Sequence, residues 1–329
     1  MDTWVWGLLV IAASILLAEI LLRLFSLTVV LPIFERRPPF NVRPVGPDLD
    51  AEYIRFAATD GLAMAGSIYR PVGEPAGVVV FCPEFGGTHW SATSYVGGLI
   101  DAGFAVFAFD FRNQGESDTD EGYSPTHWLT EKDVADAAAA LDYIARSDEF
   151  GDLPLGIVGV SRGGNAALAA AARRPQVRAV AAEGAFSTDA MMLYYAYRWA
   201  ELYVPAWFVR LIPEWHLAET LRFARRVSGL RRGVRYAVLE RSLPRLRNRP
   251  VLLITGGRDS YVAPVIPERI RRRIGPSCGP VWVVPGAKHN QGRLVATGEY
   301  DRRLVEFFSR IAVPTEPACE EKRLMEAVR

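Results

Sequence analysis

The chain has 329 residues, of which 50% are hydrophobic and 23% are charged, and its formal net charge is +1. This length and composition are typical of a globular protein with a sizeable core, and the near-neutral charge gives no electrostatic indication of a nucleic-acid partner. The three cysteines, Cys82, Cys278 and Cys319, form no CxxC motif and no Cys/His cluster. The sequence therefore predicts neither a disulfide framework nor a zinc site.

The first predicted element is an apolar stretch at residues 4–22, which reads WVWGLLVIAASILLAEILL. About 19 residues form roughly 28 Å of helix, enough to cross the hydrocarbon core of a bilayer. Its only ionisable residue, Glu19, lies four residues before Arg23, so the two side chains can pair near the membrane edge. We predict a transmembrane anchor over residues 1–33, with a cleaved signal peptide and a buried core helix as the alternatives.

Arginines follow this stretch, whereas no lysine or arginine precedes it. They are Arg23, Arg36, Arg37 and Arg43. The positive-inside rule then predicts a single-pass membrane protein whose large domain lies in the cytoplasm. Residues 34–48 are rich in proline and are predicted to form an extended linker, and residues 313–329 form a polar tail.

Between residues 49 and 312, short apolar runs alternate with helical stretches. This alternation favours an α/β domain with a mostly parallel, doubly wound sheet. Two strands are predicted within residues 53–70, around a Thr-Asp-Gly turn, and further strands at 77–82, 104–110, 155–160, 177–182, 251–257 and 281–286. Helices are predicted at 91–102, 129–146, 165–174, 267–274 and 300–311.

The run Gly159-Val160-Ser161-Arg162-Gly163 matches the G-x-S-x-G pattern and lies between an apolar strand and an Ala-rich helix. In this position the pattern is typical of a nucleophile elbow, a sharp turn that exposes a serine hydroxyl. We predict Ser161 as the nucleophile and the backbone N–H of Arg162, at the start of the helix, as an oxyanion donor.

An acid and a base follow the serine in the expected order. Asp259 comes just after the strand VLLITGG, and His289 comes just after the strand VWVVPG. Both would lie at the carboxyl edge of the sheet, where open α/β sheets bind ligands. Among the histidines only His289 lies beyond the acid, whereas His127 and His216 are interpreted as surface or packing residues. Ser161, Asp259 and His289 are thus the predicted catalytic triad.

Five segments carry a resemblance to a known family: VVVFCPEFGG, DFRNQGESD, GVSRGG, GGRDSYV and PGAKHN. With them, residues 53–311 resemble the α/β-hydrolase superfamily, and are most similar to bacterial serine-aminopeptidase-like and acylglycerol-lipase-like hydrolases. The resemblance implies the α/β-hydrolase fold. It leaves the substrate open, because the superfamily hosts many reactions.

The resemblance also implies a second oxyanion donor, the backbone N–H of Phe85. The family usually has His-Gly-x-Gly-Gly in this loop, whereas this chain has Pro83-Glu84-Phe85-Gly86-Gly87. Glu84 either places a carboxylate beside the site of developing negative charge or points away to pair with an arginine. In the loop DFRNQGESD, Asp110 is interpreted as structural, holding loop N–H groups.

Residues 186–249 interrupt the alternation and are predicted to form a helical cap. The first half is rich in large apolar residues, which either pack on the core, line an acyl pocket or touch lipid. The second half is rich in arginine, typical of a solvated face or of a surface that docks on an anionic membrane.

Together these features predict a membrane-anchored serine hydrolase that cleaves carboxylic esters or thioesters through an acyl-serine intermediate, with lipid-derived esters among the candidate substrates. The reaction requires no metal and no organic cofactor. A peptidase or amidase with the same triad is the first alternative. A non-catalytic anchored scaffold is the second, and Glu84 is the main argument for it.

Overall fold

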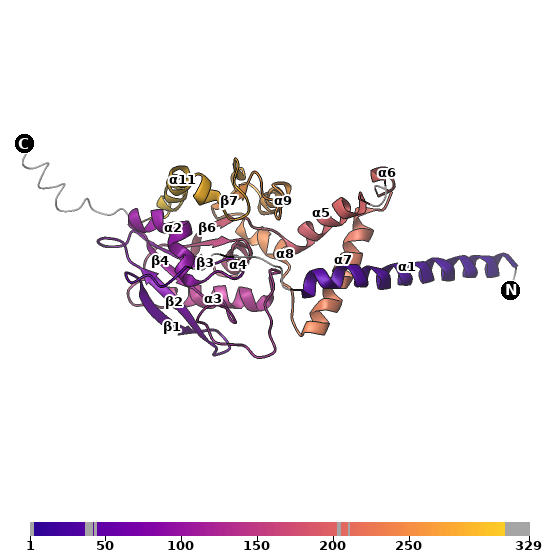
Figure 1. The fold of residues 1–329 in the computed structure, drawn as a ribbon, viewed down its shortest axis with the longest axis horizontal. Coiled ribbons are helices and arrows are strands. Elements are labelled where there is room, and N and C mark those ends of the chain that lie inside the picture. Colours follow the sequence, from indigo (N-terminus) through magenta and orange to yellow (C-terminus); the bar gives the residue numbers. More distant parts are fainter. Residues whose placement is uncertain (1–2, 37–41, 43–44, 203–204, 210, 313–329) are drawn as a thin grey trace, which may run out of the picture.

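The computed structural model describes residues 3–36, 42, 45–202, 205–209 and 211–312. Residues 37–41 and 43–44 of the predicted linker and the whole predicted tail at 313–329 lie outside these residues. The domain is built on an eight-stranded sheet with the strand order β1-β2-β4-β3-β5-β6-β7-β8 (Figure 1). β1 pairs with β2 and β2 with β4 in antiparallel register, and all other neighbours are parallel. The predicted mostly parallel sheet is confirmed.

The strands lie close to their predicted positions. They are β1 Glu52–Ala57, β2 Ala63–Tyr69, β3 Val78–Cys82, β4 Ala105–Phe109, β5 Leu155–Val160, β6 Val177–Glu183, β7 Val251–Gly256 and β8 Trp282–Val284. β3, β4 and β5 are buried along their whole length, which explains their uninterrupted apolar sequences.

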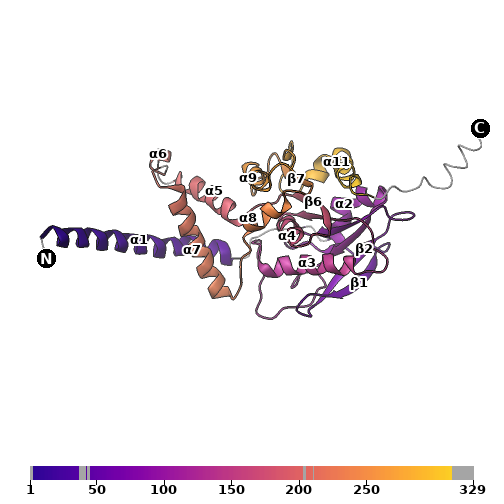
Figure 2. The same ribbon diagram turned by 180° about the vertical axis from the view of Figure 1, so that it is seen from behind.

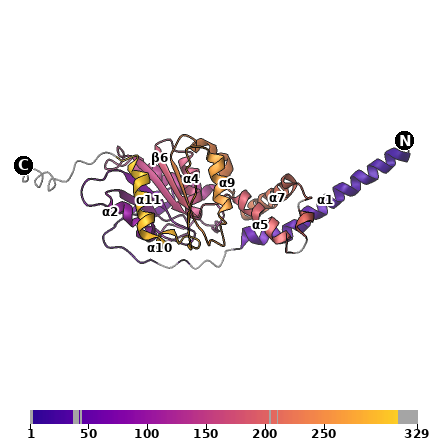
Figure 3. The ribbon, with the colours of Figure 1, turned by 90° about the horizontal axis from the view of Figure 1, so that it is seen from above.

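Helices cover both faces of this sheet (Figure 3). On one face α3 Glu131–Ala145, α4 Arg162–Ala171 and α9 Val265–Ile274 contribute to one apolar cluster. On the other face α2 Ala92–Asp101 and α11 Thr297–Ser309 contribute to a second cluster, and the short helices η1 His89–Ser91 and α10 Gly292–Val295 lie in loops. Thr130 begins α3 with a capping box, in which it exchanges hydrogen bonds with Asp133.

A helical cap connects β6 to β7, within the residues predicted for it. It consists of α5 Thr188–Ala200, α6 Ala206–Val209, α7 Glu214–Arg232, α8 Leu239–Ser242 and η2 Leu243–Leu246. Figures 1 and 2 show α5 and α7 projecting from the body toward α6, which lies at the outer end of the cap.

The N-terminal apolar stretch forms one continuous helix, α1 Thr3–Glu35, which is long and apolar enough to span a membrane or to be a signal sequence. It projects from the body as a rod (Figures 1 and 2). Phe34, predicted to begin the linker, belongs instead to this helix. Its ring is 1% exposed and lies 5.1 Å from that of Trp128 and 5.2 Å from that of Tyr236, so burial on the body extends the helix beyond residue 33.

Candidate active site

Ser161 stands on a strained turn between β5 and α4. Its backbone has φ 53° and ψ −119°, a conformation that non-glycine residues rarely adopt. Because α4 begins at Arg162, three residues earlier than predicted, the serine lies directly at the positive end of the helix. A hydrogen bond to the neighbouring strand β6 holds this turn in place, because the Ser161 N–H donates to the Glu183 carbonyl oxygen at 2.7 Å.

The glycines of the elbow are required by close backbone contacts. A Cβ atom on Gly159 would lie 2.3 Å from the Gly163 carbonyl oxygen. On Gly163 it would lie 2.2 Å from the carbonyl oxygen of Cys82, at the end of β3. The start of α4 therefore lies directly against the loop that follows β3, which the resemblance identified as the oxyanion loop.

The three predicted triad residues form one hydrogen-bonded chain. Ser161 Oγ lies 2.9 Å from His289 Nε2, and His289 Nδ1 lies 2.7 Å from Asp259 Oδ2. They follow β5, β7 and β8, and therefore meet at the carboxyl edge of the sheet. In this geometry the imidazole can accept the serine proton while the carboxylate stabilises the imidazolium.

The loop that carries Asp259 is held from two sides. Asp259 Oδ1 accepts hydrogen bonds from the backbone N–H groups of Tyr261 and Val262, both at 2.8 Å, so only Oδ2 is directed at the histidine. From the cap, the Tyr195 hydroxyl on α5 lies 2.7 Å from the Ser260 carbonyl oxygen and 2.8 Å from that of Tyr261. No local sequence signal identifies Tyr195, because its partners lie about 65 residues away.

The histidine loop is held by a buried carboxylate. Glu183, at the end of β6, accepts hydrogen bonds from the Gly292 N–H at 2.7 Å and from the Tyr300 hydroxyl at 2.9 Å. Burial raises the pKa of Glu183, while these two donors oppose the shift. Glu183 therefore ties the turn after His289 to the sheet.

The two predicted oxyanion donors carry side chains that stack on one another. The Arg162 guanidinium lies 5.0 Å from the centre of the Phe85 ring and 4.9 Å from that of Phe111. It is fully buried and also contacts Asp133 Oδ1 at 3.3 Å. This cation–π contact holds the oxyanion loop beside the start of α4.

Among the described residues Glu84 pairs with no arginine, contrary to one of the two expectations. Its side chain is buried, and Oε1 accepts a hydrogen bond from the Tyr95 hydroxyl at 2.9 Å. Burial raises the pKa of Glu84, while the hydrogen bond from Tyr95 opposes the shift. The raised pKa weakens the main argument for a non-catalytic scaffold, which assumes a full negative charge at this position.

Replacing Glu84 with glutamine should change the pH dependence of stability. Because burial raises the folded-state pKa, the folded protein holds the Glu84 proton more tightly than the unfolded chain does. This contribution is fully present below the ordinary pKa of 4.5 and is lost as pH rises through the folded value. Since glutamine stays neutral, the melting temperature of Glu84→Gln relative to wild type should rise from about pH 5 to about pH 9.

Thermal unfolding of both proteins across this pH range measures the effect. Glu121→Gln removes an exposed carboxylate and serves as the matched control. If the difference in melting temperature between Glu84→Gln and wild type stayed constant with pH, the expectation would be contradicted.

The loop DFRNQGESD is structural, as interpreted. Asp110 is buried and accepts hydrogen bonds from the backbone N–H groups of His89 at 2.6 Å and Glu116 at 2.7 Å. Burial raises its pKa to about 7. A Cβ atom on Gly115 would lie 2.0 Å from Asp110 Oδ2, so only glycine fits there.

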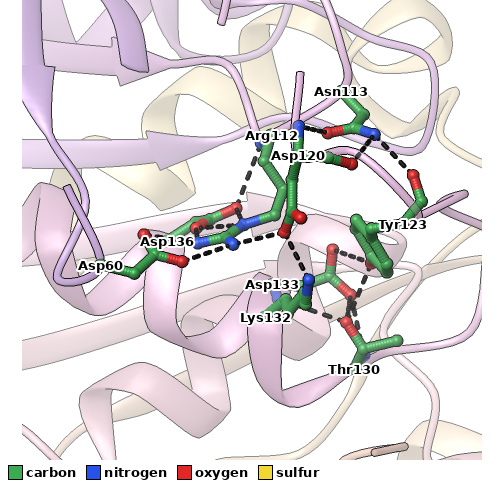
Figure 4. Close-up of polar contacts among 9 residues, drawn as sticks. All are labelled: Asp60, Arg112, Asn113, Asp120, Tyr123, Thr130, Lys132, Asp133 and Asp136. Atoms are coloured by element: carbon green, nitrogen blue, oxygen red, sulfur yellow. Dashed lines mark hydrogen bonds and ion pairs between the residues drawn. The ribbon is translucent and has the colours of Figure 1, made fainter. Parts of the chain in front are cut away.

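Arg112, in the same loop, is the centre of a buried ionic network (Figure 4). Its guanidinium donates from Nη2 to Asp136 Oδ1 at 2.6 Å, and from Nη1 to Asp60 and Asp120 at 2.8 Å each. Asp136, on α3, is fully buried and also accepts the backbone N–H of Arg112 at 3.1 Å. The network joins the β1–β2 turn, the loop after β4 and α3.

A cavity of about 330 Å³ lies beside the oxyanion loop. Glu84, Tyr95 and Asn290 line it, together with Val42 and Val45 from the predicted linker. Asn290 directly follows the triad histidine, so Val42 and Val45 line the same cavity as a neighbour of the triad.

Comparison with known proteins finds a match to one family model over part of the chain. The family model described as serine aminopeptidase, S33, matches residues 73–229, from before β3 to within α7. No curated protein matches the chain.

Several solved structures share the fold. An esterase of Pyrococcus furiosus is 18% identical with a TM-score of 0.60, and the match covers 84% of this chain and 97% of the esterase. A dienelactone hydrolase from Anabaena variabilis is 20% identical with a TM-score of 0.52, and the match covers 80% of this chain and 100% of the hydrolase. Est1E from Butyrivibrio proteoclasticus, solved with ferulic acid bound, is 17% identical with a TM-score of 0.56, and the match covers 78% of this chain and 99% of Est1E. At these identities the likeness establishes a common fold.

Proposed function

We propose that the chain, which has the α/β-hydrolase fold, is a serine hydrolase that cleaves carboxylic esters or thioesters through an acyl-Ser161 intermediate. The observation that carries the proposal is the hydrogen-bonded chain from Ser161 through His289 to Asp259, built on a strained elbow. The Pyrococcus furiosus esterase among the structural neighbours supports an ester as the substrate.

In the first half of the reaction, His289 Nε2 accepts the Ser161 proton as Oγ attacks the acyl carbonyl carbon. The oxygen of the tetrahedral intermediate carries the negative charge, and the N–H groups of Phe85 and Arg162 stabilise it. His289 then protonates the leaving alcohol or thiol, which departs and leaves the acyl-enzyme. Asp259 stabilises the imidazolium throughout this half-reaction.

In the second half, a water molecule gives its proton to His289 and attacks the acyl carbonyl carbon. Collapse of the second tetrahedral intermediate releases the carboxylic acid, and the proton returns from His289 to Ser161 Oγ. All proton transfers use groups of this chain, so the proposed reaction requires no metal and no cofactor.

An aminopeptidase or amidase is the second candidate, and the match to the serine aminopeptidase family favours it. The same triad can attack an amide, so the two candidates differ in the leaving group that the pocket accepts. Parallel assays with ester and aminoacyl-anilide substrates separate them.

We propose further that α1 anchors the domain in a membrane, with the domain on the cytoplasmic side where the flanking arginines lie. Such an anchor would place the site close to lipid-derived acyl substrates. Resistance of the full chain to alkaline carbonate extraction from membranes tests the anchor.

A fluorophosphonate probe should label the wild-type chain, because the probe reacts with an activated serine, and Ser161→Ala should not be labelled. Gel fluorescence measures labelling, and hydrolysis of p-nitrophenyl esters of increasing acyl length gives the chain-length preference. Ser309→Ala, which removes an exposed hydroxyl at the end of α11, is the matched control and should label normally. A folded wild-type chain that neither labels nor hydrolyses any ester would overturn the proposal.

A further inference from the structure

The outer end of the cap exposes large apolar side chains. Six exposed side chains from the end of α5 to the start of α7 are together called the cap tip: Trp199 (40%), Leu202 (75%), Trp207 (66%), Leu211 (68%), Ile212 (37%) and Trp215 (68%). A soluble surface rarely gathers so many large apolar groups in one segment, and a patch of this kind marks contact with protein or lipid.

The start of α7, directly after the cap tip, contacts α1. There, His216 Nε2 on α7 lies 2.8 Å from Glu19 Oε2 on α1, and Glu19 Oε1 accepts a hydrogen bond from Arg23 at 2.6 Å. Further along, the Arg23 guanidinium lies over the Phe223 ring at 5.7 Å. Figures 1 and 2 show α6 level with the middle of α1.

These contacts limit how much of α1 a bilayer can surround. From Glu19 to Glu35 the helix α1 runs beside α7, and Arg231 of α7 pairs with Glu35 at 3.1 Å. The arginines of α7 could not enter hydrocarbon, so this part of α1 lies outside the bilayer core. The free part is residues 3–18, which are exposed almost throughout. About 16 residues form roughly 24 Å of helix, about 6 Å less than the usual thickness of a bilayer core, a mismatch that local thinning of the bilayer accommodates. The cluster of Glu19, Arg23 and His216 therefore marks the level at which the bilayer ends.

We propose that the cap tip is a second membrane-inserting element, which enters the interfacial layer of the leaflet from which α1 emerges. The inference rests on the proposed role of α1 as a membrane anchor. The cap tip lies at the level of the ionic cluster, which is the interfacial depth, and tryptophan is the residue most enriched there. Its apolar side chains would be buried roughly 5–10 Å into the leaflet. α1 and the cap tip together hold the domain in one orientation on the membrane.

The apolar tip is a better candidate for membrane contact than the arginine-rich half of the cap. Arg222 and Arg225 pair with Asp189, and Arg231 pairs with Glu35. Other arginines of this half bind backbone carbonyls: Arg232 binds those of Phe34 and Ser124, and Arg249 binds those of Ala171, Arg174 and Val177. Insertion driven by apolar burial therefore requires no anionic lipid.

The experiment measures the depth of a fluorophore on the full chain in phosphatidylcholine vesicles. An environment-sensitive label is attached to Leu211→Cys in a Cys319→Ser background, in which the remaining cysteines, Cys82 and Cys278, are buried. Leu230→Cys is the matched control, because Leu230 is 85% exposed near the C-terminal end of α7, whereas the cap tip lies at the N-terminal end of that helix. A second label at Trp207→Cys gives an independent reading of the tip.

We expect doxyl groups near the headgroup end of the lipid acyl chains to quench the fluorophore at position 211 at least roughly twice as strongly as the fluorophore at position 230. Iodide, a quencher dissolved in the water, should instead quench the fluorophore at position 230 more strongly. Equal quenching at the two positions, in a chain that resists carbonate extraction, would overturn the inserted tip and leave the anchor standing. Release of the chain by carbonate would overturn both. Quenching that appears only when anionic lipid is added would also overturn apolar insertion. Because no readout uses catalysis, failure of the proposed hydrolase activity is a separate result.

Discussion

Replacing Asp259 with asparagine should lower kcat for ester hydrolysis by about 10⁴-fold while leaving the fold intact. The reason lies in the two backbone N–H groups of Tyr261 and Val262, which donate to Oδ1. They require an oxygen at that position, so the amide nitrogen of the variant must face His289 Nδ1. The imidazole then carries its proton on Nε2 and can no longer accept the proton of Ser161.

Steady-state hydrolysis of a p-nitrophenyl ester measures the loss, and an unchanged melting temperature shows that the fold is kept. The double variant Ser161→Ala/Asp259→Asn is the control for a shared role, because residues that act as one unit give non-additive losses. It should be no slower than Ser161→Ala alone. A loss of less than about tenfold in Asp259→Asn would remove Asp259 from the triad.

Replacing Arg112 with methionine should lower the free energy of unfolding by about 3–5 kcal/mol at pH 8, the usual loss when one partner of a buried ion pair is removed. Methionine fills the space of the side chain but leaves Asp136 buried without its guanidinium partner. Burial already raises the pKa of Asp136 to about 6, and the arginine opposes that shift.

Removing the arginine raises this pKa further, so the destabilisation should itself depend on pH. A raised carboxyl pKa in the folded state gives stability that is present below the unfolded value of 3.8 and is lost as pH rises through the folded value. The decrease in the free energy of unfolding caused by Arg112→Met should therefore be smaller at pH 5 than at pH 8. Urea unfolding of the full chain in detergent at both pH values measures it.

Arg302→Met is the matched control, because Arg302 pairs with Glu299 at 2.8 Å on the exposed face of α11. Removal of an exposed ion pair should lower the unfolding free energy by less than about 1 kcal/mol at either pH. A similar loss in both variants would show that the buried network contributes no more than a surface pair.

The sequence predicted the sheet and the elbow because both depend on local patterns. The apolar runs of β3 and β5 are continuous since these strands are buried on both faces, and the glycines around Ser161 are required by backbone contacts only a few ångströms away. The positions of Asp259 and His289 followed from the strands before them. Strand order within the sheet was not predicted, because pairing joins residues that are distant in the chain.

Other features depend on contacts that no local pattern reveals. Glu84 was expected either to face the site or to meet an arginine, and its partner is Tyr95, an aromatic residue on α2. His216 was interpreted as an ordinary residue, and its partner Glu19 lies 197 residues away. The contact between α1 and the cap could not be predicted, because the apolar sequence of α1 is already explained by a membrane anchor and that of the cap by packing on the core.

The Tyr195 hydroxyl, which reaches the carbonyl oxygens of Ser260 and Tyr261 from α5, makes the cap and the acid loop one mechanical unit. Any displacement of α5 from the body would break these two hydrogen bonds and remove one of the contacts that hold the loop carrying Asp259 in place beside His289.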